Sequence, residues 1–348
     1  MTSKTTEARV LDAIRERREL VNAAIDEELP IQRPERLYEA SRYILEAGGK
    51  RLRPTVTMLA AEAVSDVEPM SADYRSFPTP AGGEIDLMRA AVSIEVIQSF
   101  TLIHDDILDE DDLRRGVPAV HEQYDISTAI LAGDTLYSKA FEIMTETGAD
   151  PSDGLEAMRL LATTCTEICE GQALDVAFES RSDILPDEYL EMVELKTAVL
   201  YGAAAATPAV LLGCEEDVVD SLYQYGIDSG RAFQIQDDVL DLTVPSEKLG
   251  KQRGSDLVEE KETLITLHAR QQGVDVDGLV DADTPADVTE AEVDEAVAAL
   301  EESGSIAYAR EMAEDLTTRS KDHLRVLPDT EARCLLEDIA DYLISRGY

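Results

Sequence analysis

Apolar residues recur at helical spacing along almost the whole chain, and this pattern constrains the fold more than any other feature. They fall at positions i, i+3 and i+4, in stretches rich in the helix formers Ala, Leu and Glu. The stretches cover residues 6–28, 36–47, 55–65, 86–109, 126–147, 154–178, 187–213, 217–241, 257–272, 290–303, 305–325 and 330–346. Because no stretch alternates apolar and polar residues, we expect no sheet. The sequence predicts an all-α bundle of about ten or more helices around a deep central cavity.

The gaps between these stretches hold residues that break helices. Breakers occur at Gly48-Gly49, in 69–83, in 116–118, at Pro151 and in 243–256. At 348 residues the chain can bury a large core, and we interpret residues 1–348 as a single domain. Within that domain we expect a loop at 66–85 and an acidic surface insertion at 273–289.

The charge balance is strongly acidic, with 73 acidic and 31 basic residues and a net charge of −42. Such a field repels nucleic acid and anionic membrane surfaces, so neither is an expected partner. It also repels phosphates, so a phosphate site requires a local basic pocket or a metal. The low lysine content and abundant acid indicate adaptation to high salt, where the Debye length falls to about 3 Å at 1 M. The chain is therefore predicted to come from a halophile.

Cysteines and targeting signals point to an ordinary intracellular protein. Cys165, Cys169, Cys214 and Cys334 form no C-x-x-C motif, and we interpret them as small buried hydrophobic residues in a reducing compartment. No apolar segment follows the N-terminal residues MTSKTTEARV, and no apolar run reaches 18 residues. We expect a soluble, cytoplasmic protein without a membrane span.

Two aspartate clusters share the spelling D-D-x-x-D. The first aspartate cluster is Asp105, Asp106 and Asp109, and the second aspartate cluster is Asp237, Asp238 and Asp241. Each ends an apolar run that we expect to be buried, where an unpaired charge is very costly. Their oxygens suit Mg²⁺, which keeps waters and is completed by substrate phosphates. One copy would carry little weight in a chain this rich in aspartate, but two copies predict facing carboxylate walls that hold divalent metal.

Basic residues gather at two places in this acidic chain. The basic turn, Gly48 to Pro54 (GGKRLRP), opens a helix, where backbone N–H groups and positive side chains favour anions. Arg114 and Arg115 follow the first aspartate cluster, and guanidinium groups bind phosphate through two parallel hydrogen bonds. The two groups predict phosphate binding beside the metal sites.

Several longer motifs occur in a characteristic order. They are GGKRLRP, LIHDDILDEDDLRRG, AILAGDTLYSKAFE, LKTAVL, FQIQDDVLD and GKQRGSDLVEEKETL. Together they resemble the trans-isoprenyl diphosphate synthase (polyprenyl synthetase) family, and within it the archaeal geranylgeranyl diphosphate synthases. The resemblance spans roughly residues 40–270, and the C-terminal tail is also similar.

The resemblance implies a role for each matching residue. It implies that both aspartate clusters hold Mg²⁺, up to three ions per site, on an allylic diphosphate. It places isopentenyl diphosphate at Lys50, Arg53, Arg115 and Gln98, where many bacterial members carry His instead of Gln. It places the allylic diphosphate at Arg114, Lys196, Lys251 and Lys261, and the developing cation beside Thr197 and Gln234. It also implies a homodimer.

Other polar residues near these motifs receive no catalytic role. Arg51 stands at a position that the family leaves variable. We interpret the remaining candidates as packing residues, solvated residues or residues that support the motif side chains from behind: His104, Asp111, Asp112, His121, Cys169 and Asp175.

The reaction implied by the resemblance is an ionisation, a condensation and an elimination. Metals and basic side chains stabilise the leaving diphosphate, and the isopentenyl double bond attacks C1 of the allylic cation. The allylic partner is dimethylallyl, geranyl or farnesyl diphosphate, and the released diphosphate is the expected proton acceptor.

Product length is expected to depend on the residues below the first aspartate cluster. Phe100 lies five residues before Asp105, roughly 7.5 Å along the helix. The resemblance makes bulky Phe100, followed by the small Thr101, typical of a C20 product, geranylgeranyl diphosphate. Phe100 points well away from the Asp105 face, so ordinary core packing, or a floor at Ser93, Val96 or Ile97, stays open.

Other functions fit the sequence less well. A farnesyl or C25 diphosphate synthase differs only in the depth of the pocket. A terpene cyclase binds a single diphosphate and has no need of the basic turn and the Arg114-Arg115 pair. A non-catalytic synthase subunit usually loses its aspartate motifs, and a calcium-binding scaffold leaves the ordered basic residues unexplained.

Overall fold

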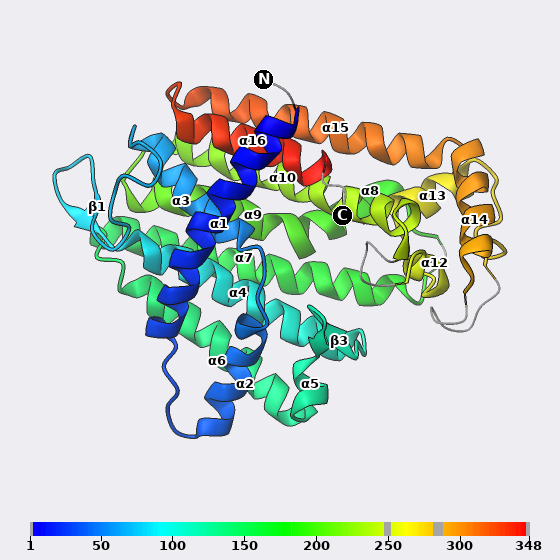
Figure 1. Cartoon of the computed structure of the whole chain (residues 1–348), viewed down its shortest axis with the longest axis horizontal. Coiled ribbons are helices and arrows are strands. Elements are labelled where there is room, and N and C mark those ends of the chain that lie inside the picture. The colour runs from blue at the N-terminus through cyan, green and yellow to red at the C-terminus, as the bar shows by residue number, and fades with distance from the viewer. Residues whose placement is uncertain (1–2, 182, 247–251, 281–287, 346–348) are drawn as a thin grey trace. The chain divides into compact units, whose positions relative to one another are not determined.

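The computed structural model describes residues 3–181, 183–246, 252–280 and 288–345, and these are mostly helical (Figure 1). The all-α prediction is confirmed. The elements in chain order are α1 (Ser3–Glu28), α2 (Glu35–Glu46), α3 (Leu52–Val64), β1 (Phe77–Pro78), β2 (Glu84–Ile85), α4 (Leu87–Leu108), β3 (Leu113–Arg114), β4 (Val117–Pro118), α5 (Val120–Gln123), α6 (Ile126–Thr145), α7 (Pro151–Phe178), α8 (Pro186–Val193), the π-helical turn η1 (Glu194–Ala198), α9 (Val199–Leu211), α10 (Glu216–Thr243), α12 (Ser255–Val258), α13 (Leu264–Gln271), α14 (Glu290–Glu302), α15 (Ser305–His323), the 3-10 turn η2 (Leu324–Val326) and α16 (Glu331–Ser345).

The chain divides into two compact units. Unit 1 comprises residues 1–165, 200–226 and 323–339, and unit 2 comprises residues 166–199, 227–322 and 340–348. The predictions of a single domain over residues 1–348 and of a central cavity stay predictions.

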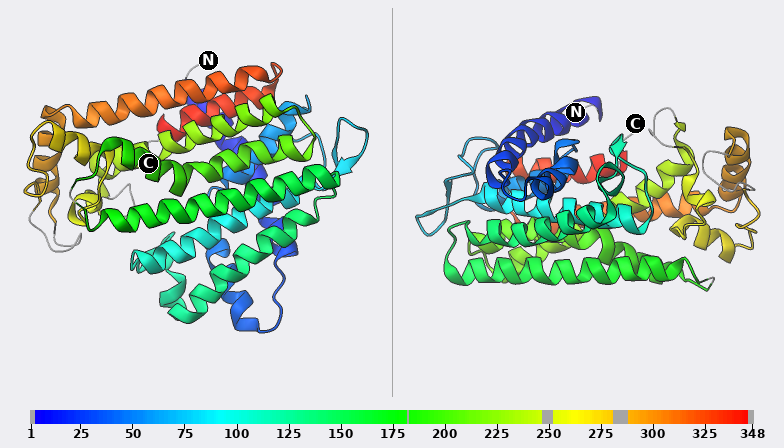
Figure 2. Two further views of the ribbon diagram at one scale, coloured as in Figure 1. Left: turned by 180° about the vertical axis from the view of Figure 1, so that it is seen from behind. Right: turned by 90° about the horizontal axis from the view of Figure 1, so that it is seen from below.

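Helix α4 is the central element of unit 1. Its sequence is apolar on nearly every side, as expected of a helix that is covered all round. It lies beside α6, and two further views in Figure 2 show the same arrangement. Both helices begin at an aspartate that accepts a backbone hydrogen bond: Asp86 caps α4 and Asp125 caps α6. The first turns of α4 and of α6 are thereby fixed.

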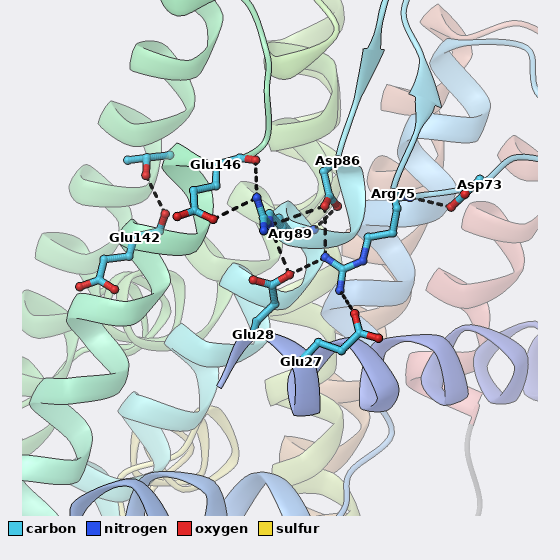
Figure 3. Close-up of polar contacts among 9 residues, drawn as sticks. Glu27, Glu28, Asp73, Arg75, Asp86, Arg89, Glu142 and Glu146 are labelled. Atoms are coloured by element: carbon cyan, nitrogen blue, oxygen red, sulfur yellow. Dashed lines mark hydrogen bonds and ion pairs between the residues drawn. The ribbon is translucent and has the colours of Figure 1, made fainter. Parts of the chain in front are cut away.

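A network of ion pairs ties the loop after α3 to the start of α4 (Figure 3). Arg75 contacts Glu27 at 2.7 Å, Glu28 at 2.5 Å and Asp86 at 3.1 Å. Arg89 contacts Glu28 at 3.2 Å and Glu146 at 3.0 Å. Two guanidinium groups thus bridge carboxylates from α1, from α4 and from the residue after α6.

Unit 2 has its own apolar core. Large buried members include Phe178 before α8, Tyr189 on α8, Ile235 and Val239 on α10 and Leu300 on α14. Helix α13 contacts both α8 and α14. This core supports the end of α10, where the second aspartate cluster lies.

The expected helices are confirmed within a few residues, with two exceptions. The stretch 257–272 was predicted as one helix, but α12 ends at Val258 and Thr263 caps a new helix, α13. The stretch 187–213 is helical throughout but contains the wider turn η1. A capping hydroxyl and a local change of helix type leave the apolar spacing unchanged, so periodicity did not reveal them.

The prediction of no sheet was wrong, because the described residues contain two short β-ribbons. β1 pairs with β2 and β3 pairs with β4, each as an antiparallel ribbon of two-residue strands. Strands this short carry too few residues to show alternation. The first ribbon falls inside the expected loop 66–85, and the acidic insertion 273–289 lies partly outside the described residues.

No helix among the described residues combines the length and the apolar character that a membrane crossing requires.

Candidate active site

The first aspartate cluster lies at the C-terminal end of α4. Asp105 and Asp106 belong to the last turn, and Asp109 is the C-cap residue, with its N–H bonded to the Asp105 carbonyl at 2.8 Å. The C-terminal end of a helix carries a partial negative charge, which disfavours anions and favours cations. Three carboxylates at this end therefore favour the binding of a cation nearby.

Asp106 is fully buried and is paired with the guanidinium of Arg114. Its Oδ1 accepts from Arg114 Nε at 2.6 Å, and Arg114 also contacts Asp111 at 2.7 Å. Burial raises the pKa of Asp106, and the Arg114 guanidinium opposes that rise. The same carboxylates raise the pKa of Arg114 against the effect of burial. The second oxygen of Asp106, Oδ2, is buried and has no hydrogen-bond partner among the described residues.

The second aspartate cluster lies near the C-terminal end of α10. Asp238 and Asp241 are buried and Asp237 is half-buried. The carboxylate of Asp238 accepts from the Tyr189 hydroxyl and from Gln234 Nε2, the latter at 3.1 Å. Burial raises the pKa of Asp238 well above its usual range, and the nearby Asp256 carboxylate adds to the effect.

Asp241 organises the residues that lead into α12. Its Oδ1 accepts from the Ser255 hydroxyl at 3.0 Å, and its Oδ2 accepts from the Asp256 N–H at 3.3 Å. Its carbonyl oxygen accepts from the Gly254 N–H at 2.9 Å. Asp241 therefore holds Asp256 close to the buried Asp238, and the Asp256 carboxylate adds negative charge to the second aspartate cluster.

Lys196 and Thr197 lie in the π-helical turn η1. Such turns occur mostly as single insertions in α-helices and are frequent at functional sites. Lys196 Nζ contacts Asp175 at 2.5 Å, and Thr197 Oγ1 donates to Gln234 Oε1 at 3.3 Å. A Cβ on Gly171 would stand 2.2 Å from the Lys196 backbone nitrogen, so only glycine lets α7 approach η1 this closely. In unit 2, Lys196, Thr197, Gln234 and Asp238 thus form one connected group.

The donor chemistry of both clusters fits Mg²⁺. All the donors are carboxylate oxygens, the ligands that Mg²⁺ prefers, and the partnerless Oδ2 of Asp106 can accept a cation or its bound water. No group of three His, Cys, Asp or Glu side chains in the described ranges is close enough to ligate a metal without other donors.

The basic turn lies in unit 1, and two of its basic side chains, Lys50 and Arg53, are at least partly exposed. Lys50 is exposed, and the Arg53 guanidinium lies 4.1 Å from the centre of the Tyr201 ring. The Nε of Arg53 is buried and has no acceptor among the described residues. An ordered guanidinium with an unused donor is suited to an anion.

Arg115 reaches the basic turn from the β3–β4 ribbon. Arg115 and Gly116 form the two-residue turn of this hairpin, with φ of 56° and 78°, the conformation of a type I′ turn. Arg115 Nη1 donates to the carbonyl of Ile44 at 3.0 Å and to that of Gly48. Gly49 leaves room for this guanidinium, because a Cβ there would lie 3.0 Å from Arg115 Cζ.

The remaining predicted site residues are spread over both units. Gln98 is half-buried on α4, and Lys261 is exposed and contacts Glu259 at 2.8 Å. Lys251 lies outside the described residues. Thr101 is buried and donates to the Gln98 carbonyl at 2.9 Å.

Phe100 is buried on the side of α4 that meets α6. Its ring contacts the rings of His104 and Tyr137, with centroids 4.9 Å and 5.2 Å away. Ser93, two turns earlier, also meets α6 by donating to the Ala140 carbonyl at 2.8 Å. This agrees with the expectation that Phe100 points away from the Asp105 face.

Three residues hold site groups, and sequence reasoning allowed such a supporting role for Asp111 and Asp175 but missed Tyr189. Asp175 contacts Lys196, Asp111 contacts Arg114, and Tyr189 donates to Asp238. Asp175 follows Gly171 by four residues on α7, so a glycine and a carboxylate on one helix face were an available signal. Tyr189 stands in an ordinary amphipathic stretch and gives no signal.

The other residues without a predicted role behave mostly as expected. His104 packs on Phe100, and the side chain of His121 is largely covered beside Glu122. The Asp112 carbonyl accepts from the Ala119 N–H. Cys165 is buried, but Cys169 is exposed, so its interpretation as a buried hydrophobic residue was wrong. The reason is that Cys169 faces outward on α7, one turn from Cys165.

Known proteins resemble this chain over almost its full length. The polyprenyl synthetase family matches residues 34–300. A geranylfarnesyl diphosphate synthase of Natronomonas pharaonis is 67% identical over 99% of this chain and 100% of its own. A geranylgeranyl pyrophosphate synthetase structure from Geoglobus acetivorans is 44% identical, with a TM-score of 0.85 over 96% of this chain and 99% of its own. A polyprenyl synthase from Caulobacter crescentus, complexed with calcium and isoprenyl diphosphate, is 29% identical, with a TM-score of 0.80 over 97% of this chain and 98% of its own.

The chain belongs to the polyprenyl synthetase family, as its motifs indicated. It is an enzyme, a short-chain trans-prenyltransferase.

Proposed function

We propose that this enzyme condenses isopentenyl diphosphate with C5 to C15 allylic diphosphates to give geranylgeranyl diphosphate. The proposal rests on one observation: a strongly acidic chain places two carboxylate clusters at helix C-terminal ends and also carries five of its 31 basic residues in the basic turn and at Arg114-Arg115. That combination suits a reaction of two diphosphates, one bound through metal and one through basic side chains.

In this proposal the two aspartate clusters hold Mg²⁺ on the allylic diphosphate. Asp106, Asp238 and Asp241 are the members with the strongest need for a cation, because all three are buried near a helix C-terminus. When bound, Mg²⁺ neutralises the charge that develops on the leaving diphosphate. Arg114 and Lys196 add positive charge from the protein, each held by a carboxylate: Asp106 and Asp175, respectively. Lys251 and Lys261 are proposed as further ligands of this diphosphate.

Isopentenyl diphosphate is proposed to bind Lys50, Arg53 and Arg115, with Gln98 beside them. The unused Nε of Arg53 and the anchored guanidinium of Arg115 support this assignment. Replacing Lys50 by Ala is expected to raise KM for isopentenyl diphosphate more than KM for the allylic partner.

The reaction then follows from these positions. The C1–O bond of the allylic diphosphate breaks, and diphosphate leaves with the bonding electrons. Thr197 and Gln234, which are hydrogen-bonded to each other, offer oxygen atoms to the allylic cation. The isopentenyl double bond attacks C1 and forms the new C–C bond, and a proton then passes to the released diphosphate. Binding both partners in fixed pockets makes this attack effectively intramolecular.

The proposed C20 product rests on the family resemblance at Phe100. The ring is buried with His104 and Tyr137 on the side of α4 that meets α6, so a role in limiting chain growth has to be tested against core packing. Replacing Phe100 by Ala is expected to lengthen the product. An unchanged product would show that Phe100 is core packing.

A C25 product is the second candidate. It is favoured by the 67% identity to a relative named geranylfarnesyl diphosphate synthase. A deeper pocket is the only physical change that this product requires.

We also propose a homodimer. Helix α6 exposes large apolar residues: Ile126 at 57%, Ile130 at 42% and Leu131 at 56%. An exposed apolar stripe on one helix is typical of a protein interface. Light scattering is expected to give twice the chain mass, and a monomeric mass would contradict the proposal.

The test is incubation with labelled isopentenyl diphosphate, Mg²⁺ and C5, C10 or C15 allylic primers in high salt, followed by chromatography of the products. We expect the label in C20 diphosphate. Label in C25 diphosphate would support the second candidate. Cyclic hydrocarbons would identify a terpene cyclase, and no incorporation by folded protein would identify a non-catalytic subunit.

A further inference from the structure

Arg51 is almost completely buried although it lies between two exposed or half-exposed basic residues. Only 3% of Arg51 is accessible, whereas Lys50 is exposed and Arg53 is half-buried. Its backbone φ is 52°, a left-handed conformation that L side chains rarely adopt. The side chain thus turns inward at the N-cap of α3, away from the side on which its neighbours present their charges.

All three nitrogens of the Arg51 guanidinium have partners on different elements. Nη1 donates to Glu95 at 2.6 Å on α4, and Nε donates to Asn22 at 2.9 Å on α1. Nη2 donates to the carbonyl of Leu45 at 2.5 Å on α2. One side chain therefore fixes the basic turn against three helices of unit 1.

Glu95 links this anchor to Arg115. The carboxylate is 3% accessible, and its Oε1 also lies 3.9 Å from Arg115 Nη2. Burial lowers the pKa of Arg115, and the Glu95 carboxylate opposes that effect. Glu95 is thus the common counter-ion of one buried and one half-buried guanidinium, and it stabilises the charge of Arg115 at the place where it meets the basic turn.

We propose that Arg51 and Glu95 are positioning residues that hold the basic turn and Arg115 in the geometry that binds the diphosphate of isopentenyl diphosphate. Neither residue contacts the substrate. Arg51 orients Lys50 and Arg53 through the backbone that they share, and Glu95 orients Arg115 through its charge. This inference rests on the proposed pocket and adds residues to which the family resemblance gave no role.

The test compares Glu95→Gln with a matched control, Glu62→Gln. Glu62 is also a buried carboxylate of unit 1, 1% accessible, and is paired with the buried Arg17 at 2.6 Å. It accepts from Tyr74 and the Met70 N–H, near the end of α3 that is opposite the basic turn. Both changes break a buried ion pair and are expected to lower the melting temperature.

Only Glu95→Gln is expected to raise KM for isopentenyl diphosphate, roughly tenfold, with KM for farnesyl diphosphate changed less than about twofold. Arg51→Lys provides a second variant if Glu95→Gln does not fold. Lysine keeps the charge but lacks the planar fork, so we expect a smaller rise in the same KM. A KM for isopentenyl diphosphate that changes no more in Glu95→Gln or Arg51→Lys than in Glu62→Gln would overturn the inference.

Lys50→Ala separates this inference from the proposed pocket. If Lys50→Ala raises KM for isopentenyl diphosphate and Glu95→Gln does not, the pocket stands and the positioning role fails. If Lys50→Ala leaves that KM unchanged, the pocket assignment itself fails.

Discussion

The two aspartate clusters share one motif but have different surroundings. In the first, the buried Asp106 contacts the guanidinium of Arg114. In the second, the hydrogen-bond donors to Asp238 within the described residues are neutral, a phenol from Tyr189 and an amide from Gln234, and a second carboxylate, Asp256, is nearby. The protein thus supplies a cation to one cluster and adds negative charge to the other.

This difference indicates which cluster depends more on a bound cation. Both lie at the C-terminal end of a helix, where negative charge is disfavoured. Arg114 already neutralises part of the first cluster. The described donors to Asp238 are neutral hydrogen-bond donors that carry no compensating charge, so the second cluster should respond more strongly to Mg²⁺.

The largest effect is expected for Asp238→Asn. The side chain keeps its shape but loses its charge, so we expect kcat to fall roughly 10²–10³-fold, the range found when one electrostatic contact to developing charge is removed. Steady-state turnover at saturating Mg²⁺ and substrates measures this. Turnover at the wild-type rate would show that the second cluster holds no catalytic metal.

Arg114→Gln should have a smaller effect on kcat, roughly 10-fold to 10²-fold. The change removes a ligand for the leaving diphosphate, but it also frees the carboxylate of Asp106 for metal. The apparent affinity for Mg²⁺ should therefore rise while kcat falls. The matched control is Arg36→Gln. Arg36 is exposed and contacts Asp125 at 2.9 Å, so this variant should keep the wild-type kcat and apparent affinity for Mg²⁺.

The two clusters should also differ in their contribution to the stability of metal-free protein. Asp106→Asn weakens the partner of Arg114 and should cost about 1–3 kcal/mol of unfolding free energy. Asp238→Asn removes a buried charge that has no protein cation in the described residues, so it should raise the melting temperature. Thermal unfolding in EDTA measures the stability of both variants. If both melting temperatures rise, or both fall, the proposed difference between the clusters is wrong.

Ser255→Ala should have the smallest effect. It deletes one neutral hydrogen bond to Asp241 and should cost about 0.5–1.5 kcal/mol of unfolding free energy. The Asp256 N–H still holds Asp241, so kcat should fall less than about tenfold. A loss as large as that of Asp238→Asn would mean that Asp241 itself requires exact placement by Ser255.

Much of the fold could be predicted from sequence because helices display their period in every turn. The end of α4 and the end of α10 were both found in this way, and so were the aspartate clusters that they carry. The turn η1 was not, since one extra residue in a helix leaves the apolar spacing almost unchanged. The β3–β4 ribbon was missed because a hairpin of two-residue strands depends on Arg115 and Gly116 having positive φ.

The supporting residues were harder to predict than the residues of the motifs. Glu95 stands alone in the apolar run SIEVIQ, and a single acid in such a run requires a buried cation. That signal was present, but it could not identify Arg51 as the partner, because the two residues come together only in the folded chain. Tyr189 became recognisable only when α8 and α10 were placed in one core.

The most direct test of the account is the melting temperature of the protein as Mg²⁺ is added in the presence of inorganic diphosphate. A ligand that binds only the folded state raises that temperature, and the rise grows with the logarithm of ligand concentration over Kd. We predict a clear rise for wild type, a reduced rise for Asp106→Asn and none for Asp238→Asn. An equal rise in all three proteins would contradict the claim that the aspartate clusters hold metal on a diphosphate.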